Sequence, residues 1–148
     1  MPFHYPFQSV LRLRQSLERQ EEQRLFAIAA TVARLRAEIE DWEHSRMELK
    51  RIASREVMAG SAGALMQFAT LRDASAAEAQ LKLQRELVDA EQQRLQQLGV
   101  YQEARQKREI LEGLRDRQEE TYDREAARRE QEQADDVFLI RFVKKQDE

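Results

Sequence analysis

The sequence contains no cysteine, only two prolines and only four glycines. Without cysteine the chain has no disulfide, no thiolate metal ligand and no cysteine nucleophile, which suits the cytoplasm. Both prolines, Pro2 and Pro6, precede the first periodic segment, so no proline interrupts the rest of the chain. These absences favour long, uninterrupted helices.

An excess of one charge sign and a long apolar run are also missing. The formal net charge is −3 and both signs are finely mixed, whereas a nucleic-acid-binding protein would show a basic face. The first ten residues hold no apolar run that would make a signal peptide, and no segment is apolar enough to span a bilayer. We therefore expect a cytoplasmic protein without direct membrane insertion.

Motifs for catalysis are absent as well. The sequence has no Gly-rich phosphate loop, and its two histidines, His4 and His44, lack ligand partners at metal spacing. Carboxylates on an exposed helix are usually solvated charge, and no nucleophile–base arrangement is recognisable. We predict a non-enzymatic protein with no cofactor and no metal, which acts by binding and positioning other proteins.

A heptad pattern of apolar residues dominates the first half of the chain. Steps of three and four residues place them on one stripe of a helix, as in a coiled coil. The stripe consists of Leu25, Ile28, Val32, Leu35, Ile39, Trp42, Leu49 and Ala53, and Arg46 interrupts it. Upstream, Val10, Leu13 and Leu17 continue one residue out of phase, which indicates a stutter or a separate contact. We predict a helix over about residues 7–59.

The segment Gly60-Ser61-Ala62-Gly63 is the one cluster of helix-breaking residues. A left-handed Gly60 would end the first helix, and a chain reversal here makes an antiparallel hairpin. We favour this monomeric hairpin over a continuous rod that dimerises with a second chain.

The second helix is expected over about residues 65–136. It begins with an apolar cluster of Leu65, Met66, Phe68 and Leu71, and is predicted to pair with the first helix through Leu81, Val88, Leu95 and Leu98.

The second helix is the longer of the two and becomes highly charged. Residues 102–136 hold twelve acidic and eight basic side chains, so this part is stabilised mainly by pairs such as Glu103–Lys107, Glu120–Arg124 and Glu125–Arg129. We expect it to overhang the base of the hairpin, a form suited to insertion into a ring or groove.

The apolar tail 137–148 leaves three alternatives: it covers the hairpin base, binds a partner or is disordered. The fold class is therefore all-α, a two-helix antiparallel coiled-coil hairpin with a C-terminal helix overhang, in a single domain 1–148.

Trp42 and the two apolar residues Phe68 and Leu71 allow two interpretations. Each is either a packing residue of the coiled coil or a binding anchor near the hairpin tip, since two helices do not fully bury an indole ring.

Three segments together resemble one family. They are residues 3–14 (FHYPFQSVLRLR), residues 104–117 (ARQKREILEGLRDR) and residues 122–136 (YDREAARREQEQADD). Their order and spacing are similar to those of the flagellar export protein FliJ family, over nearly the whole chain. Phe7 stands at a position where the family has Leu, Asp136 stands where Glu is commoner, and the apolar tail departs from the pattern.

The resemblance implies a stalk of the flagellar type III export apparatus. Such a stalk sits in a hexameric export ATPase, contacts the transmembrane export gate at the cytoplasmic face of the inner membrane and recycles export chaperones. The resemblance implies gate contacts at Ile39, Trp42, Leu49, Phe68 and Leu71. It implies ATPase contacts at Leu13, Arg14, Arg128, Arg129, Asp135 and Asp136. The alternatives are the stalk of a non-flagellar type III secretion system and a generic coiled-coil scaffold.

Overall fold

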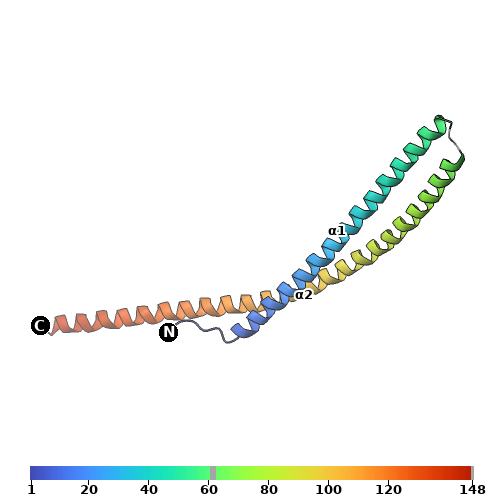
Figure 1. The fold of residues 1–148 in the computed structure, drawn as a ribbon. Helices are drawn as coiled ribbons and strands as arrows, with labels where there is room; N and C mark the ends of the chain where they lie inside the picture. The colour runs from blue at the N-terminus through green and yellow to red at the C-terminus, as the bar shows by residue number, and fades with distance from the viewer. Residues whose placement is uncertain (61–62, 148) are drawn as a thin grey trace. The chain divides into compact units, whose positions relative to one another are not determined.

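The computed structural model describes residues 1–60 and 63–147, and these form two α-helices joined as a hairpin (Figure 1). Helix α1 covers Gln8–Met58 and helix α2 covers Gly63–Gln146. No strand occurs among the described residues. The all-α hairpin predicted from the sequence is confirmed.

The ends of α1 follow local backbone rules. The helix starts two residues after Pro6, where the Leu11 amide donates to the Phe7 carbonyl at 2.9 Å. At the other end Gly60 has φ +90°, a left-handed conformation in which its amide donates to the Val57 carbonyl at 3.2 Å. Glycine adopts this conformation without steric cost, so Gly60 ends α1 as predicted. Ser61 and Ala62 of the predicted turn lie outside the described residues.

Helix α2 continues ten residues beyond its expected end at residue 136. The apolar segment 137–143 is therefore helical rather than a separate tail. Lys144 and Lys145 lie in the last turn of α2, where positive charge interacts favourably with the helix dipole.

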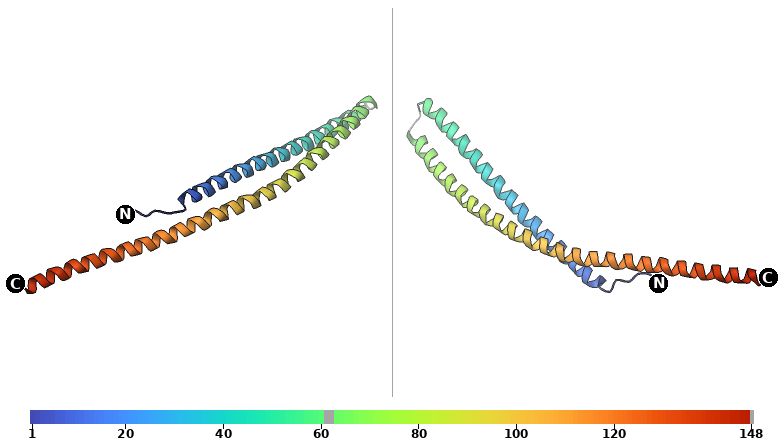
Figure 2. Two further views of the ribbon diagram at one scale, coloured as in Figure 1. Left: turned by 90° about the horizontal axis from the view of Figure 1, so that it is seen from below. Right: turned by 180° about the vertical axis from the view of Figure 1, so that it is seen from behind.

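The contacts within the chain divide it into two units. Unit 1 comprises Met1–Glu18 and Glu103–Glu148, and unit 2 comprises Arg19–Gln102. In unit 2 the parts of α1 and α2 run alongside each other in opposite directions, which all three views of Figures 1 and 2 show.

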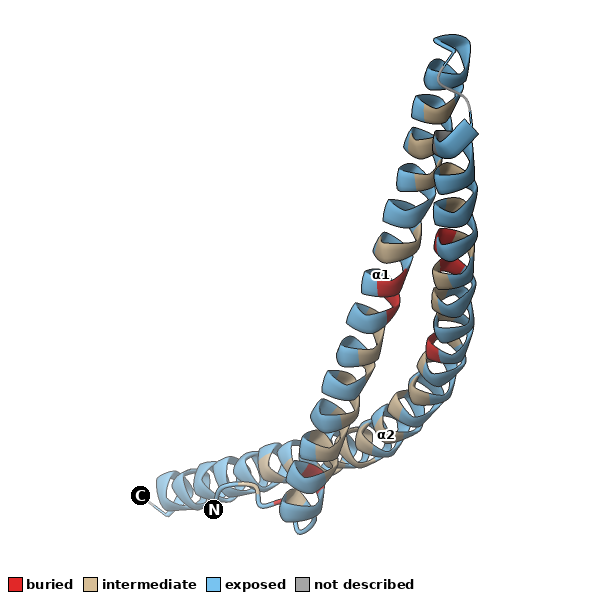
Figure 3. Cartoon of the chain, turned by 45° about the vertical axis from the view of Figure 1, so that its right-hand side comes forward, coloured by how far each residue is buried: buried red, intermediate tan, exposed pale blue. Residues whose placement is uncertain are grey.

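The α1 side of the unit 2 seam, the line along which the two helices pack, is the predicted heptad stripe. Val32 and Leu35 are each only 2% exposed and form a core with Ala90 of α2 (Figure 3). Leu25, Ile28, Ile39, Leu49 and Ala53 are half-buried around it. Trp42 also falls on this stripe but stays 39% exposed. The sequence therefore predicted the packing face of α1 correctly.

The predicted packing face of α2 is wrong. Leu81, Val88, Leu95 and Leu98 are exposed, by between 37% and 65%. The residues of α2 that pack against α1 are instead Ala76, Gln80, Leu83, Leu87 and Ala90. They lie one residue earlier in each heptad, and the polar contacts described below explain why this stripe is used.

In unit 1 the buried side chains are Tyr5 and Leu11. Leu11 lies fourteen residues before Leu25, which is two heptads, so the α1 stripe continues in phase through Leu11 and no stutter is needed. Of the three residues expected to lie out of phase, Val10 and Leu13 are exposed and Leu17 is half-buried.

The C-terminal part of α2 in unit 1 is an overhang. Ala126 is the last half-buried residue, and every described residue from 127 to 147 is exposed. The pairs Glu103–Lys107 and Glu120–Arg124 form at 3.3 and 2.5 Å. Arg129 instead donates to the backbone carbonyl of Glu125 at 3.4 Å.

Candidate interaction surfaces

A polar layer interrupts the apolar seam of unit 2. Arg46 donates from Nε to Asp73 Oδ1 at 2.9 Å and from Nη1 to Gln80 Oε1 at 2.8 Å. Gln80 is only 6% exposed, and its Nε2 donates to Glu43 Oε1 at 3.2 Å. The hydrogen bond from Arg46 lowers the pKa of Asp73, against the opposing effect of desolvation. Arg46, which breaks the apolar pattern, is therefore a paired seam residue.

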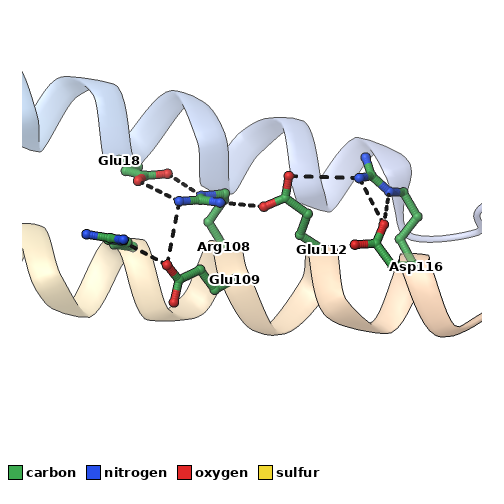
Figure 4. A network of polar contacts seen from close by, with 7 residues as sticks. Glu18, Arg108, Glu109, Glu112 and Asp116 are labelled. Carbon is green, nitrogen blue, oxygen red and sulfur yellow. Dashed lines mark hydrogen bonds and ion pairs between the residues drawn. The ribbon is translucent and has the colours of Figure 1, made fainter.

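A second charged network joins the two segments of unit 1. Arg108 binds both carboxylate oxygens of Glu18, at 2.6 and 3.1 Å, and also contacts Glu112 (Figure 4). Hydrogen bonds to Glu18 and then to Glu112 raise the pKa of Arg108. Glu109 and Asp116 extend the network along α2 (Figure 4). A two-pronged arginine–carboxylate contact is directional, so it fixes the alignment of α1 on α2 in this unit.

The residues before α1 lie against α2 through aromatic rings. The Tyr5 hydroxyl donates to the Leu111 carbonyl at 2.9 Å, and the ring centroids of Phe3 and Tyr122 are 5.7 Å apart. Phe7 meets the Tyr5 ring edge-on, with centroids 5.9 Å apart. We call Phe3, Tyr5, Phe7 and Tyr122 the aromatic clasp. It holds the non-helical N-terminal segment on the helix surface.

Sequence reasoning missed the aromatic clasp and the Glu18–Arg108 contact. Glu18 lies seven residues before Leu25, so it occupies a seam position on the same heptad. A charged residue at a seam position requires a partner of opposite charge on the other helix, and this signal could have led to Arg108. The aromatic clasp has no comparable heptad pattern in the sequence, because Phe3 and Tyr5 precede the helix.

The predicted gate residues are partly brought together near the end of unit 2 that contains Gly60. Trp42 and Leu49 line one open groove with Arg72 and Ala76. Arg72 also lies near Phe68, since its guanidinium is 5.9 Å from the centre of the Phe68 ring. Ile39 lies half-buried in the seam, and Leu71 is strongly exposed. Whether these residues bind the gate stays a prediction.

The predicted ATPase residues fall into two separate groups in unit 1. Leu13 and Arg14 lie on α1, exposed and half-buried respectively. The other four lie on the overhang of α2 and are exposed: Arg128, Arg129, Asp135 and Asp136. Arg14 is one turn from Glu18, which pairs with Arg108. Arg128 is twenty residues beyond Arg108, or about 30 Å at about 1.5 Å per residue. The structure therefore does not bring the two groups together.

The described residues contain no cluster of side chains arranged to hold a metal ion. Over the same residues, neither helix has an apolar stretch of membrane-spanning length. His4 and His44 are both exposed.

Together the fold and these surfaces define an antiparallel coiled-coil hairpin that presents exposed apolar and charged side chains. The family model described as "Flagellar FliJ protein" matches residues 3–147. The chain therefore belongs to the FliJ family, and the resemblance seen in the sequence is confirmed. Membership makes it a protein associated with flagellar export, in a family of non-enzymatic export components. No curated protein and no solved structure matches the chain.

Proposed function

We propose that this protein is a monomeric, non-enzymatic stalk of the flagellar type III export apparatus. It binds the hexameric export ATPase through unit 1 and the export gate through the end of unit 2 that contains Gly60. Export chaperones are further partners, and the protein works in the cytoplasm at the inner face of the membrane. The observation that carries the proposal is the family match over residues 3–147.

The overhang of α2 supports an ATPase contact. Its residues 127–147 are all exposed, and Arg128 pairs with Glu132 of the same helix at 3.5 Å. Such pairs in an isolated helix contribute only about 0.2–0.5 kcal/mol each. A helix of this length with so little support gains stability when a ring or groove surrounds it.

Trp42 and Phe68 support the gate contact. Both rings stay substantially exposed; Arg72 lines the same groove as Trp42, and its guanidinium lies near the Phe68 ring. Tryptophan and arginine are enriched in binding hot spots, and phenylalanine is enriched in protein–protein interfaces.

The ATPase contact is tested by adding the purified protein to the matched export ATPase and measuring hydrolysis and ring assembly. We expect stimulation, and a loss of about tenfold in affinity with Arg128→Glu/Arg129→Glu. The matched control is Arg34→Glu/Arg85→Glu, which reverses two exposed arginines in unit 2. Hydrolysis by the protein alone would contradict a non-enzymatic role. An ATPase that ignores the wild-type protein would favour the generic scaffold instead.

The gate contact is tested with Trp42→Ala/Phe68→Ala. Truncating interface anchors commonly costs about 2 kcal/mol or more, or roughly thirtyfold in affinity. Phe26→Ala removes an exposed ring elsewhere in unit 2 and should leave gate binding unchanged. A sharp drop in melting temperature with unchanged gate binding would show that Trp42 is a seam residue, for which aromatic truncation costs about 3–5 kcal/mol.

A further inference from the structure

Helix α2 carries two parallel heptad stripes in unit 2, and only one of them is used for packing. The packed stripe comprises Asp73, Ala76, Gln80, Leu83, Leu87, Ala90, Arg94 and Gln97. The second stripe, shifted by one residue, comprises Ala74, Ala77, Leu81, Gln84, Val88, Glu91, Leu95 and Leu98. Four of the eight packed residues are polar, but only two of the eight in the second stripe are. The more apolar stripe of α2 is thus the one that α1 leaves exposed.

Helix α1 presents an apolar surface on the same side. Arg36 forms an ion pair with Glu91 of the second stripe at 2.6 Å. Arg36 continues the three- and four-residue steps of Phe26, Ala29 and Ala33, so these residues lie on the same flank of the seam. We call the combined surface the open face. It consists of Phe26, Ala29 and Ala33 of α1 and Leu81, Val88, Leu95 and Leu98 of α2.

The composition of the open face is unusual for solvent-exposed coiled coil. Phe26 is 66% exposed, which is more than any of the four large residues of α2. The alanine side chains of α1 are shorter than the leucine side chains of α2. The surface between the alanines of α1 and the leucines of α2 therefore leaves room for a further helix. Small residues allow a helix backbone to approach closely.

We propose that the open face binds one amphipathic α-helix of a partner protein. This partner helix lies along unit 2 as a third helix of the coiled coil. Leu81, Val88 and Leu95 recur every seven residues. A heptad stripe stays in contact only with a helix that supercoils around it. Arg36 and Glu91 already satisfy each other at the centre of the face, so the bound side of the partner helix is apolar rather than charged.

The size of the open face decides between a partner helix and a second copy of the chain. From Leu81 to Leu98 the face is about 25 Å long at about 1.5 Å per residue, and it is about one helix diameter, or about 10 Å, wide. This gives roughly 250 Å² per side, whereas stable protein–protein interfaces bury about 800 Å² per partner. The open face is therefore too small for a stable dimer and fits a single helix that binds reversibly.

The open face is distinct from the predicted gate contact. The groove beside Trp42 is lined by Ser45 and Ile52, which continue the heptad of Glu38 on the other flank of the α1 seam. A helix on the open face would therefore leave Trp42 accessible.

The test uses the full-length protein and two fluorescent synthetic peptides of three heptads. One has Leu at the first and fourth positions of each heptad and Glu or Lys elsewhere, and the other has Gln in place of Leu. Fluorescence anisotropy should show that the Leu peptide binds at least about tenfold more tightly than the Gln peptide. Val88→Glu/Leu95→Glu should lose about tenfold or more of this binding. Both residues are exposed, so the melting temperature should be unchanged.

The control variant is Val100→Glu/Ile110→Glu, which places the same charges at exposed apolar residues of α2 outside the open face. It should bind the Leu peptide as the wild type does. Equal binding of the two peptides, or equal loss in both variants, would overturn the proposal. So would a dimer in light scattering that Val88→Glu/Leu95→Glu dissociates, because the face would then join two copies. Neither ATPase nor gate is used, so failure here leaves the proposed stalk function untouched.

Discussion

The two units of the chain differ in the balance of interactions that stabilise them. In unit 2, Val32, Leu35 and Ala90 form a buried apolar core, which a polar layer around Arg46 interrupts. Unit 1 buries Tyr5 and Leu11, and its segment before α1 and the first turns of α1 also contact α2 through the Tyr5 hydrogen bond and the Glu18–Arg108 ion pair. Apolar packing has no preferred direction, whereas a hydrogen bond or a two-pronged ion pair requires defined geometry.

The two units should respond differently to mutation. A core residue of unit 2 contacts several neighbours, so its loss weakens the whole seam. The Tyr5 hydrogen bond and the Glu18–Arg108 ion pair of unit 1 are separate directional contacts, so the loss of one affects mainly the segment that it holds. We therefore expect mutations in the apolar core of unit 2 to act on global unfolding, and mutations in these two contacts of unit 1 to act more locally.

The largest effect should come from Leu35→Ala. Leu35 is almost completely buried, and truncating a buried leucine costs about 2–5 kcal/mol in the free energy of unfolding. Leu95→Ala makes the same chemical change at an exposed position and should stay within about 0.5 kcal/mol of wild type. Urea unfolding followed by circular dichroism measures both. Equal losses would show that unit 2 has no distinct apolar core.

The second effect concerns the charged network of unit 1. Arg108→Ala leaves Glu18 and Glu112 without their shared partner, and a partly buried group that loses its hydrogen bond costs about 1–3 kcal/mol. Arg124→Ala removes an exposed pair with Glu120 four residues before it, which should cost only about 0.2–0.5 kcal/mol. The same urea unfolding distinguishes them. If the free energy of unfolding falls equally in the two variants, the contact between α1 and α2 contributes no more stability than a surface ion pair.

A smaller and more local effect is expected from Tyr5→Phe. The change keeps the ring but removes the hydrogen bond to the Leu111 carbonyl, at a cost of about 0.5–1.5 kcal/mol. Hydrogen exchange should speed up in the segment before α1 and in the first turns of α1, with little change in residues 25–53. Tyr122→Phe keeps the ring that contacts Phe3 and serves as the control. Faster exchange throughout unit 2 would contradict the local response of unit 1.

The smallest effect is a pH dependence in the polar layer of unit 2. The pKa of Asp73 is lowered from its ordinary value of 3.8 by the hydrogen bond from Arg46. A lowered pKa stabilises the fold above the unfolded-state pKa, and this stabilisation is lost as the pH falls through the folded-state value. Wild type should therefore exceed Asp73→Asn in urea midpoint at pH 7, and the difference should shrink below about pH 4. In an Arg46→Gln background the difference should be absent at both values; a persistent difference would exclude Arg46 as its cause.

Several features could be predicted from the sequence because they depend on one segment alone. The heptad of α1 determines which face packs, since apolar residues at steps of three and four form one stripe on any helix. Gly60 determines where α1 ends, because glycine adopts positive φ without steric cost. The charged region after residue 102 predicts an exposed helix, and its overhang follows from the unequal lengths on either side of the turn.

Only the tertiary structure decided which stripe of α2 packs against α1. Leu81, Val88 and Leu95 make the second stripe the more apolar one, so hydrophobicity alone predicts the wrong face. Arg46 on α1 requires a polar partner inside the seam, and the packed stripe supplies Asp73 and Gln80.

The same holds nearer the base of the hairpin, where Glu21 accepts a hydrogen bond from Gln97 at 2.5 Å and Glu18 pairs with Arg108. A charge left unpaired inside the seam costs more free energy than a few exposed leucines. The sequence by itself therefore determined the helices, the turn and the packing face of α1. The pairing of charged groups between the two helices, which no single segment reveals, decided the packing face of α2 and left the open face exposed.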